Sequence, residues 1–168
     1  MVTRLRHQVT VLGSFSYATG DQEGNYHSVI IAQQDCPDTL NQFNNQILAI
    51  NGYDSYSGYL AMKVLMTARQ MPNAFFETIL VTGSHRESIH AVADGKADLA
   101  AIDCVSWHLA TNFDRVSNTL KIIATAPARP GLPLITAPHA SPCLLYPFTT
   151  SDDTLRLATG GYSVVTHI

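Results

Sequence analysis

Short apolar runs alternate with segments in which apolar residues recur at helical spacing along most of the chain. The runs expected to form strands are 7–12, 26–33, 47–51, 77–82, 98–102 and 120–124. The segments expected to form helices are 35–45, 58–71, 86–94, 103–112 and 153–158. Residues 13–25 and 126–133 are rich in Gly, Ser, Asn or Pro and are expected to be loops. Because continuous apolar strands separated by helices are usually parallel and covered on both faces, the pattern predicts an α/β fold with parallel-rich sheets.

The composition favours a domain that builds its core without disulfides or metal. The chain has 168 residues, of which 46% are hydrophobic and 14% are charged, whereas about 25% charged residues is usual. The formal net charge of −3 lacks the basic excess of a general nucleic-acid binder, so nucleic acid is not an expected partner. Polar chemistry in this chain is therefore expected to depend largely on neutral groups.

The cysteines and histidines do not form a metal or redox motif. Cys36, Cys104 and Cys143 are irregularly spaced without a CxxC pair, which argues against a zinc ribbon or a thioredoxin-like dithiol. Three unpaired thiols are expected, with that of Cys104 buried. The seven histidines include no HExxH motif, so neither a metal nor a cofactor is expected.

Neither an export signal nor a membrane anchor is visible in the sequence. Residues 1–11 carry two arginines but lack the apolar stretch of a secretory signal. No segment approaches the run of about 20 apolar residues that a membrane span needs.

Polar residues gather after three of the expected strands. In an α/β sheet, ligands bind outside the carboxyl ends of the strands. After the strand at 47–51, Ser55 and Ser57 are candidate helix N-caps, and Gly58 would let a ligand approach the backbone closely. The same serines could also be ordinary caps without a ligand.

The next two strand ends carry Ser84 with His85, and Asp103. Ser84 and Glu87 form a capping-box pattern, which explains both residues structurally. His85 is a poor helix starter and is not explained in that way. Asp103 follows four apolar residues, so it should either cap the next helix or meet a donor on a ligand.

Together these residues predict a site for a small oxyanion that carries a proton. Two helix N-termini with hydroxyl groups favour an anion, and His85 can donate to it. Asp103 can only accept, so it requires a hydrogen on the ligand. Hydrogenphosphate or a phosphonate would therefore fit better than fully ionised sulfate.

Three runs of this chain resemble the phosphate and phosphonate solute-binding proteins of ABC transporters: INGYDSYSGYLA, VTGSHRESIHAVADGKADLAAIDCVSW and TAPARPGLPLIT. These proteins form the phosphonate-binding-like branch of the type 2 periplasmic binding fold. The resemblance covers residues 17–136. It implies two α/β lobes, joined by two crossing strands, that close on an oxyanion.

The resemblance also implies a role for each candidate residue. The anion-binding helix start would be Ser55, Tyr56, Ser57 and Gly58. Ser84 and His85 would be a second anchor, and Asp103 would accept from the ligand hydroxyl. Tyr26 matches an aromatic residue that often faces the cleft, although it could also be a core residue of its strand.

By this resemblance the protein is a non-catalytic solute-binding protein in the periplasm, with an ABC permease as its partner. Family members extend further upstream, so the first lobe is expected to be incomplete and the chain to be a partial member. Residues 1–33 and 120–168 would form the remainder of the first lobe with the hinge strands, and residues 34–119 the second lobe. An exposed edge of the first lobe could then support a homodimer.

Two other functional classes stay open. An enzyme on the same fold could be a hydrolase using Ser57 or Ser84 with His85 and Asp103, or a biosynthetic enzyme. The hydrolase lacks the G-x-S-x-G elbow, and the adjacency of Ser84 and His85 is awkward for a base and its nucleophile. The third interpretation is that the protein is a purely structural remnant of the family that binds no ligand.

Overall fold

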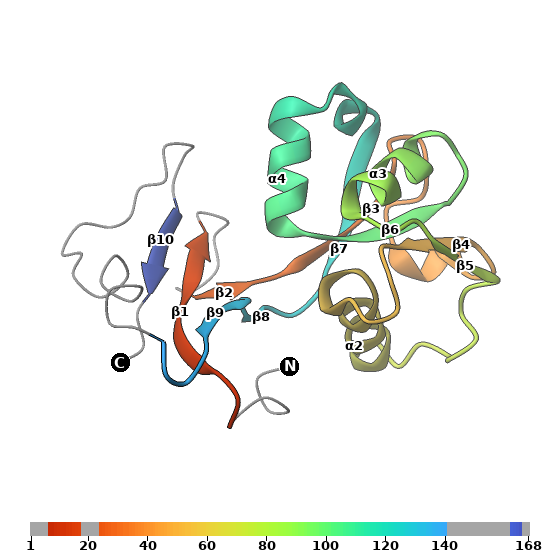
Figure 1. Cartoon of the computed structure of the whole chain (residues 1–168). Helices are drawn as coiled ribbons and strands as arrows, with labels where there is room; N and C mark the ends of the chain where they lie inside the picture. The colour runs from red at the N-terminus through yellow and green to blue at the C-terminus, as the bar shows by residue number, and fades with distance from the viewer. Residues whose placement is uncertain (1–6, 18–23, 141–161, 166–168) are drawn as a thin grey trace. The chain divides into compact units, whose positions relative to one another are not determined.

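The computed structural model describes residues 7–17, 24–140 and 162–165, and the chain divides into two compact units (Figure 1). The first unit comprises Met1–Tyr26 and Arg129–Ile168, and the second is His27–Ala128. No helix among the described residues combines the length and apolar character needed to cross a membrane.

The second unit is built on a five-stranded mixed sheet with the strand order β5-β4-β6-β3-β7. Its strands are β3 (Ser28–Gln33), β4 (Ile47–Ile50), β5 (Thr78–Val81), β6 (Leu99–Asp103) and β7 (Leu120–Thr125). Strand β4 is parallel to both β5 and β6, whereas β3 is antiparallel to both β6 and β7.

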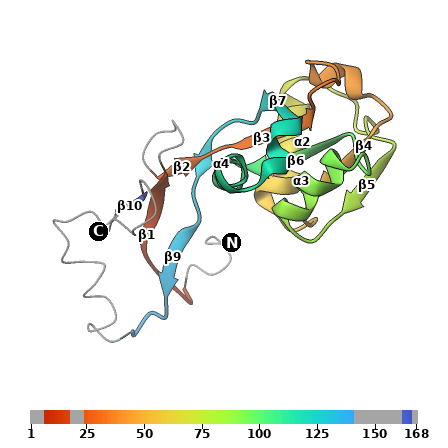
Figure 2. The same cartoon turned by 90° about the horizontal axis from the view of Figure 1, so that it is seen from above.

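Helices cover both faces of this sheet (Figures 1 and 2). One core layer lies under α2 (Ala61–Ala68) and the short 3₁₀ helix η1 (Leu40–Phe43). The other lies under α3 (His85–Ala93) and α4 (Cys104–Phe113), which is followed by the 3₁₀ helix η3 (Arg115–Thr119). Successive residues of β3 serve the two layers, because Ile30 packs into the first and Ile31 into the second.

The α/β class and the strands expected between residues 26 and 124 are confirmed, except that the strand expected at 26–33 begins at Ser28 as β3. The direction of β3 also differs from the parallel arrangement suggested by its apolar run. A strand buried on both faces is apolar throughout, whatever the direction of its neighbours. The apolar pattern of β3 therefore reports burial and not strand direction.

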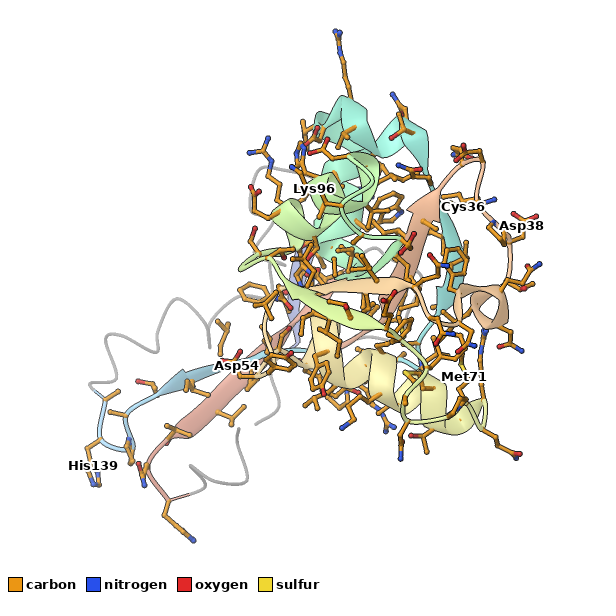
Figure 3. The ribbon with its side chains drawn as sticks, turned by 90° about the vertical axis from the view of Figure 1, so that its right-hand side faces the viewer. Cys36, Asp38, Asp54, Met71, Lys96 and His139 are labelled. Atoms are coloured by element: carbon orange, nitrogen blue, oxygen red, sulfur yellow. The ribbon has the colours of Figure 1, made fainter. Side chains whose placement is uncertain are left out.

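The helix expected at 35–45 is reduced to η1, with Leu40 and Phe43 buried. These two side chains are three residues apart, and a single 3₁₀ turn places them on one side. Asn45 then turns the chain with a φ of 59°, as its left-handed tolerance allows. Lys121 of β7 holds this loop by an ion pair to Asp38 at 2.6 Å and a hydrogen bond to the carbonyl of Cys36. Figure 3 labels Cys36 and Asp38 on the loop.

The first unit contains strands where loops were expected. β1 (Thr10–Tyr17) pairs antiparallel with β9 (Pro133–Thr136) and with β10 (Tyr162–Val165), and β2 (Asn25–Tyr26) pairs with β8 (Arg129–Pro130). The strand expected at 7–12 thus begins later, at Thr10, and ends later, at Tyr17. The β1–β9 register shifts between Val11 and Gly13. Gly13 and Ser14, which were expected to begin a loop, therefore lie at an irregularity inside a strand.

The boundaries of the units also differ from the expected division. Strands β3 and β7 were assigned to the first lobe, but they are hydrogen-bonded into the sheet of the second unit. Cys104 is buried, as expected. The segment 153–158 and Cys143 lie outside the described residues.

Candidate anion-binding site

Three successive strand-to-helix turns meet at one edge of the sheet of the second unit. Strands β4, β5 and β6 share their direction, so the turns that follow them lie at the same edge. The turn after β4 leads into η2 (Tyr56–Leu60), a single π-helical turn that continues directly into α2. The turns after β5 and β6 lead into α3 and α4.

The imidazole of His85 is the centre where these turns meet. Its Nε2 lies 2.9 Å from Ser57 Oγ and 3.2 Å from Asp103 Oδ2. Asn51, which directly follows β4, places its Nδ2 at 3.4 Å from the same nitrogen. The side chains of His85 and Asp103 are only 13% and 17% exposed, and Ser57 is buried.

The surroundings of His85 favour the neutral ring. Burial lowers the pKa of His85 below its ordinary value of 6.5, while the Asp103 carboxylate and the backbone carbonyl of Ala101 oppose this shift. An ionised carboxylate can only accept, so the contact with Asp103 favours the tautomer with its hydrogen on Nε2. In this tautomer Nε2 cannot accept from the Asn51 amide, so the 3.4 Å approach of Nδ2 is a contact and not a hydrogen bond. In the same tautomer Ser57 Oγ can accept from this nitrogen, which leaves its hydroxyl hydrogen for another acceptor.

Two buried polar atoms of the cluster have no hydrogen-bond partner within the described part of the chain. They are Nδ1 of His85 and Oδ1 of Asn51. Buried polar atoms without partners are rare and costly in proteins. Both atoms lie in the same cluster, where a ligand or a proton would satisfy them.

Asp103 acts as the cap considered for it and also contacts His85, while its role towards a ligand stays a prediction. Its Oδ1 accepts from the backbone N–H of Ser106 and its Oδ2 from the hydroxyl of Ser106, both at 2.7 Å, so that it caps α4. The same Oδ2 contacts His85. Because each carboxylate oxygen can accept two bonds, Oδ1 retains capacity for a donor on a ligand.

The first helix start is shaped around Gly58. Ser55 caps it by accepting from the backbone N–H of Gly58 at 3.1 Å. The N–H groups of Tyr56 and Ser57, the first two of the helix, have no carbonyl partner inside it. A Cβ on Gly58 would lie 1.9 Å from Oδ1 of Asn51, so the glycine is what lets Asn51 lie against the helix.

The expected site residues therefore separate into two groups. Ser57, His85 and Asp103 are in mutual contact, and Ser55 and Gly58 shape the first turn. Ser84 is exposed and accepts from the N–H of Glu87 at 3.1 Å, so it acts as the cap of α3. Tyr56 is half-buried beside the apolar layer under α2.

Tyr26 belongs to the first unit, where it is half-buried and pairs with Arg129 between β2 and β8. Its role at a ligand stays a prediction. Asn51 was missed by the sequence analysis, because it reads as the last residue of an apolar strand. Asn51 could have been predicted as a candidate from its position at the end of a strand, just before a helix start that contains a glycine.

The Ser57, His85 and Asp103 cluster differs in geometry from a hydrolytic triad. In a triad the serine and the aspartate bind opposite nitrogens of the histidine, so that the ring can take the serine proton while the aspartate orients it. Here both Ser57 and Asp103 lie at Nε2. The arrangement is suited to holding a ligand by donors and one acceptor and not to activating Ser57.

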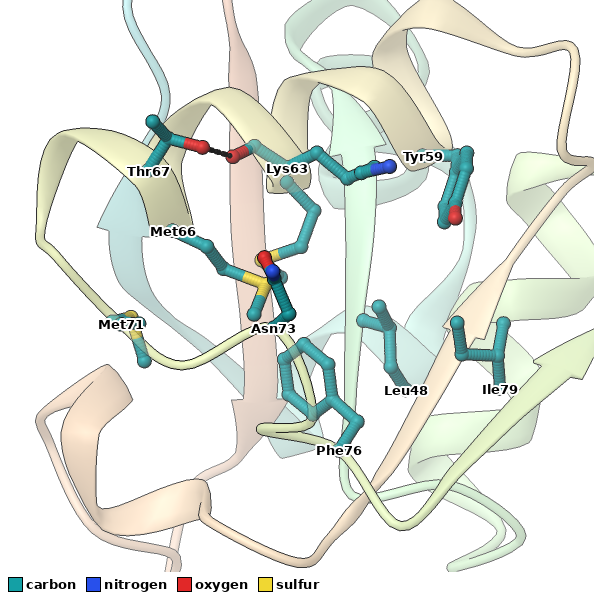
Figure 4. A pocket seen from close by; sticks show the side chains of 10 residues that line it. Leu48, Tyr59, Lys63, Met66, Thr67, Met71, Asn73, Phe76 and Ile79 are labelled. Carbon is teal, nitrogen blue, oxygen red and sulfur yellow. Dashed lines mark hydrogen bonds between the residues drawn. The ribbon is translucent and has the colours of Figure 1, made fainter.

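A cavity of about 280 Å³ lies on the α2 side of the same unit and shares no lining residue with the cluster (Figure 4). Its walls include Met66, Met71 and Phe76, and Lys63 is its one charged lining residue. Its lining also includes the polar residues Tyr59, Thr67 and Asn73, and the cavity lies apart from the three turns. No group of three or more His, Cys, Asp or Glu side chains that could hold a metal occurs in the described residues.

Comparison with known families matches residues 1–145 to the model of the ABC transporter, phosphonate, periplasmic substrate-binding proteins. The chain belongs to this family. The match includes the three turns described above, and the family consists of substrate-binding proteins and not enzymes. No curated protein sequence matches the chain.

Three solved structures share the fold. A binding-protein component of an ABC phosphonate transporter from Pseudomonas aeruginosa has a TM-score of 0.70 at 19% identity, over 95% of this chain and 58% of its own. XAC2383 of Xanthomonas citri, bound to chloride, has 0.66 at 16%, over 86% and 56%. PhnD1 of Prochlorococcus marinus, in complex with methylphosphonate, has 0.60 at 13%, over 76% and 49%. The chain thus spans 49–58% of the length of these three structures.

Proposed function

We propose that this protein binds phosphate, a phosphonate or a closely related oxyanion at the cluster around His85, as the solute-binding component of an ABC-type transporter. The observation that carries the proposal is the convergence of Ser57, Asp103 and Asn51 on Nε2 of His85. Three separate turns supply these groups, and no single helix cap accounts for all of them.

The chemistry of the cluster matches a tetrahedral anion with one hydrogen. The hydroxyl of Ser57, the amide of Asn51 and the first N–H groups of η2 are donors, and the dipole of the helix that they begin favours negative charge. Asp103 is the one ionised acceptor in the cluster, with Oδ1 able to take a hydrogen from the ligand. Hydrogenphosphate and phosphonate monoanions offer that hydrogen, whereas sulfate does not.

Family membership supports the wider role. The family is named for periplasmic substrate-binding proteins of phosphonate ABC transporters, and one structural neighbour was solved with methylphosphonate. We extend this to a periplasmic location and a permease partner for the present chain. The enzyme alternative gains no support from the cluster, because Ser57 and Asp103 share one nitrogen of His85.

Calorimetric titration of the protein with phosphate, methylphosphonate and sulfate tests the proposal. We expect phosphate or methylphosphonate to bind at least about tenfold more tightly than sulfate, which corresponds to about 1.4 kcal/mol. Asp103→Asn should reduce this preference, because its amide can donate to an anion without a hydrogen. His108→Gln, an exposed histidine of α4, is a matched control and should bind normally. The proposal fails if none of the three anions binds to the folded protein.

A further inference from the structure

We propose that the site takes up its anion together with a proton from solvent, and that this proton is held on Nδ1 of His85. The inference rests on the proposed function and adds the charge state in which the ligand is held. It starts from two features of His85, which are its contact with the Asp103 carboxylate and its buried, unpartnered Nδ1.

Among the described residues of the second unit, the charged groups around His85 leave a bound anion without a cation. Asp103, from the end of β6, is the charged side chain in contact with the ring, while Ser57 from η2 and Asn51 after β4 are neutral. On the same helix, Arg86 is 75% exposed and points to Asp114 at 3.4 Å, and Glu87 is exposed at the helix start. A second negative charge at the cluster would therefore meet the carboxylate of Asp103 with only the imidazole available to become positive.

The geometry provides a place for that proton. With the first hydrogen on Nε2, the second must bind Nδ1, a buried atom without a hydrogen-bond partner in the described residues. A buried N–H without an acceptor is costly, so the proposal requires the bound anion to accept from Nδ1. The backbone carbonyl of Ala101 acts on the ring in the direction that favours its protonation. Without an anion, burial outweighs Asp103 and Ala101 and keeps the ring neutral. An anion adds an attraction that burial no longer outweighs.

Proton uptake makes the affinity depend on pH in a defined direction. Because the free ring is neutral above its lowered pKa and the bound ring is protonated, alkaline pH opposes binding. We expect the dissociation constant for a ligand in a fixed charge state to rise about tenfold per pH unit, with about one proton taken up per anion. A proton carried on the ligand towards Asp103 would give a similar uptake, so the two locations must be separated experimentally.

The experiment combines calorimetry with nitrogen NMR on the same protein. Binding of phosphate and of methylphosphonate is measured at pH 8 in buffers of different ionisation enthalpy, which gives the protons taken up. In protein labelled with ¹⁵N-histidine, the ring nitrogens of His85 are followed during the titration and assigned by their loss in His85→Gln. His108→Gln is the matched control and should leave uptake and affinity unchanged.

The expected result is proton uptake with both nitrogens of His85 moving to the values of an imidazolium, and loss of the uptake in His85→Gln. Binding during which His85 keeps the spectrum of a neutral ring would overturn the inference and leave the proposed function standing. Uptake that persists in His85→Gln and disappears in Asp103→Asn would also overturn it, since the proton would then be on the ligand. Absence of binding of either anion would overturn both.

Discussion

Gly58 determines whether Asn51 can reach His85. A side chain on Gly58 would collide with Oδ1 of Asn51 at 1.9 Å and would also crowd its backbone nitrogen at 3.3 Å. The neighbouring glycine, Gly52, differs because a Cβ there would meet only the carboxylate of Asp54, an exposed side chain, at 2.9 Å. The two glycines of one turn therefore have different tolerance for substitution.

Gly58→Ala should lower both stability and anion affinity. Replacing glycine by alanine inside a helix usually stabilises it by roughly 0.5–1 kcal/mol, but overpacking at a buried contact destabilises by about 1–3 kcal/mol. We expect the second effect to dominate and Asn51 to be displaced from His85. Urea unfolding and phosphate titration measure the two effects.

Gly52→Ala is the matched control for this change, because Asp54 can rotate away. It should retain the stability and the affinity of the unchanged protein. Equal losses in Gly52→Ala and Gly58→Ala would show that the turn responds to any added side chain and that the contact with Asn51 is not decisive.

Helix α3 carries His85 on its first turn and is fixed at both ends. At the start, Ser84 accepts from the N–H of Glu87. At the other end, the side-chain amide of Gln33 in β3 donates to the carbonyls of Val92 at 3.0 Å and Ala93 at 3.1 Å. These contacts satisfy backbone groups that a helix leaves free at its ends and hold the position of the imidazole.

Substitution of Ser84 separates its role as a cap from a role at the anion. Ser84→Ala should lower the unfolding free energy by about 1 kcal/mol through the lost cap. Ser84→Asp keeps a capping oxygen and should keep stability, but its charge would weaken phosphate binding by about tenfold or more if Ser84 lies at the anion. Thermal unfolding and titration of both variants decide this, and unchanged affinity in Ser84→Asp would limit Ser84 to capping.

The sequence allowed most elements of the second unit to be predicted, because burial gives strands and helices distinct apolar periods. It also allowed Ser57, His85 and Asp103 to be predicted as neighbours, since residues at the ends of parallel strands meet at one edge. The antiparallel direction of β3 and the reduction of 35–45 to a 3₁₀ turn were not predictable, because both depend on packing partners distant in sequence. Asn51 was hidden by its continuity with the apolar run of β4.

The second unit has the properties of an independent folding domain. His27–Ala128 contains a complete five-stranded sheet with core layers on both faces, and the cluster around His85 lies wholly within it. A domain with its own core is expected to unfold cooperatively.

A fragment comprising residues 27–128 should therefore fold alone and unfold in one transition. If the proposed site is complete within it, phosphate at about 100 times its dissociation constant should raise the unfolding free energy by about 2.7 kcal/mol. Circular dichroism with urea, with and without phosphate, measures both. A gradual, non-cooperative loss of signal would show that the fragment needs the remaining residues to fold.

The adjacent placement of β3 and β7 has a consequence for how such a unit can be combined with other sequences. The chain enters through β3 and leaves through β7, which pair from Val29 with Thr125 to Gln33 with Leu120, and Ala126 donates to the carbonyl of Ser28 at 2.8 Å. Because the first and last strands of the unit are neighbours, the unit can be inserted into a loop of a host protein. The two host segments that flank the insertion then stay close together. New termini could equally be opened at a distant loop after joining the present ends, which would make this unit a natural subject for circular permutation.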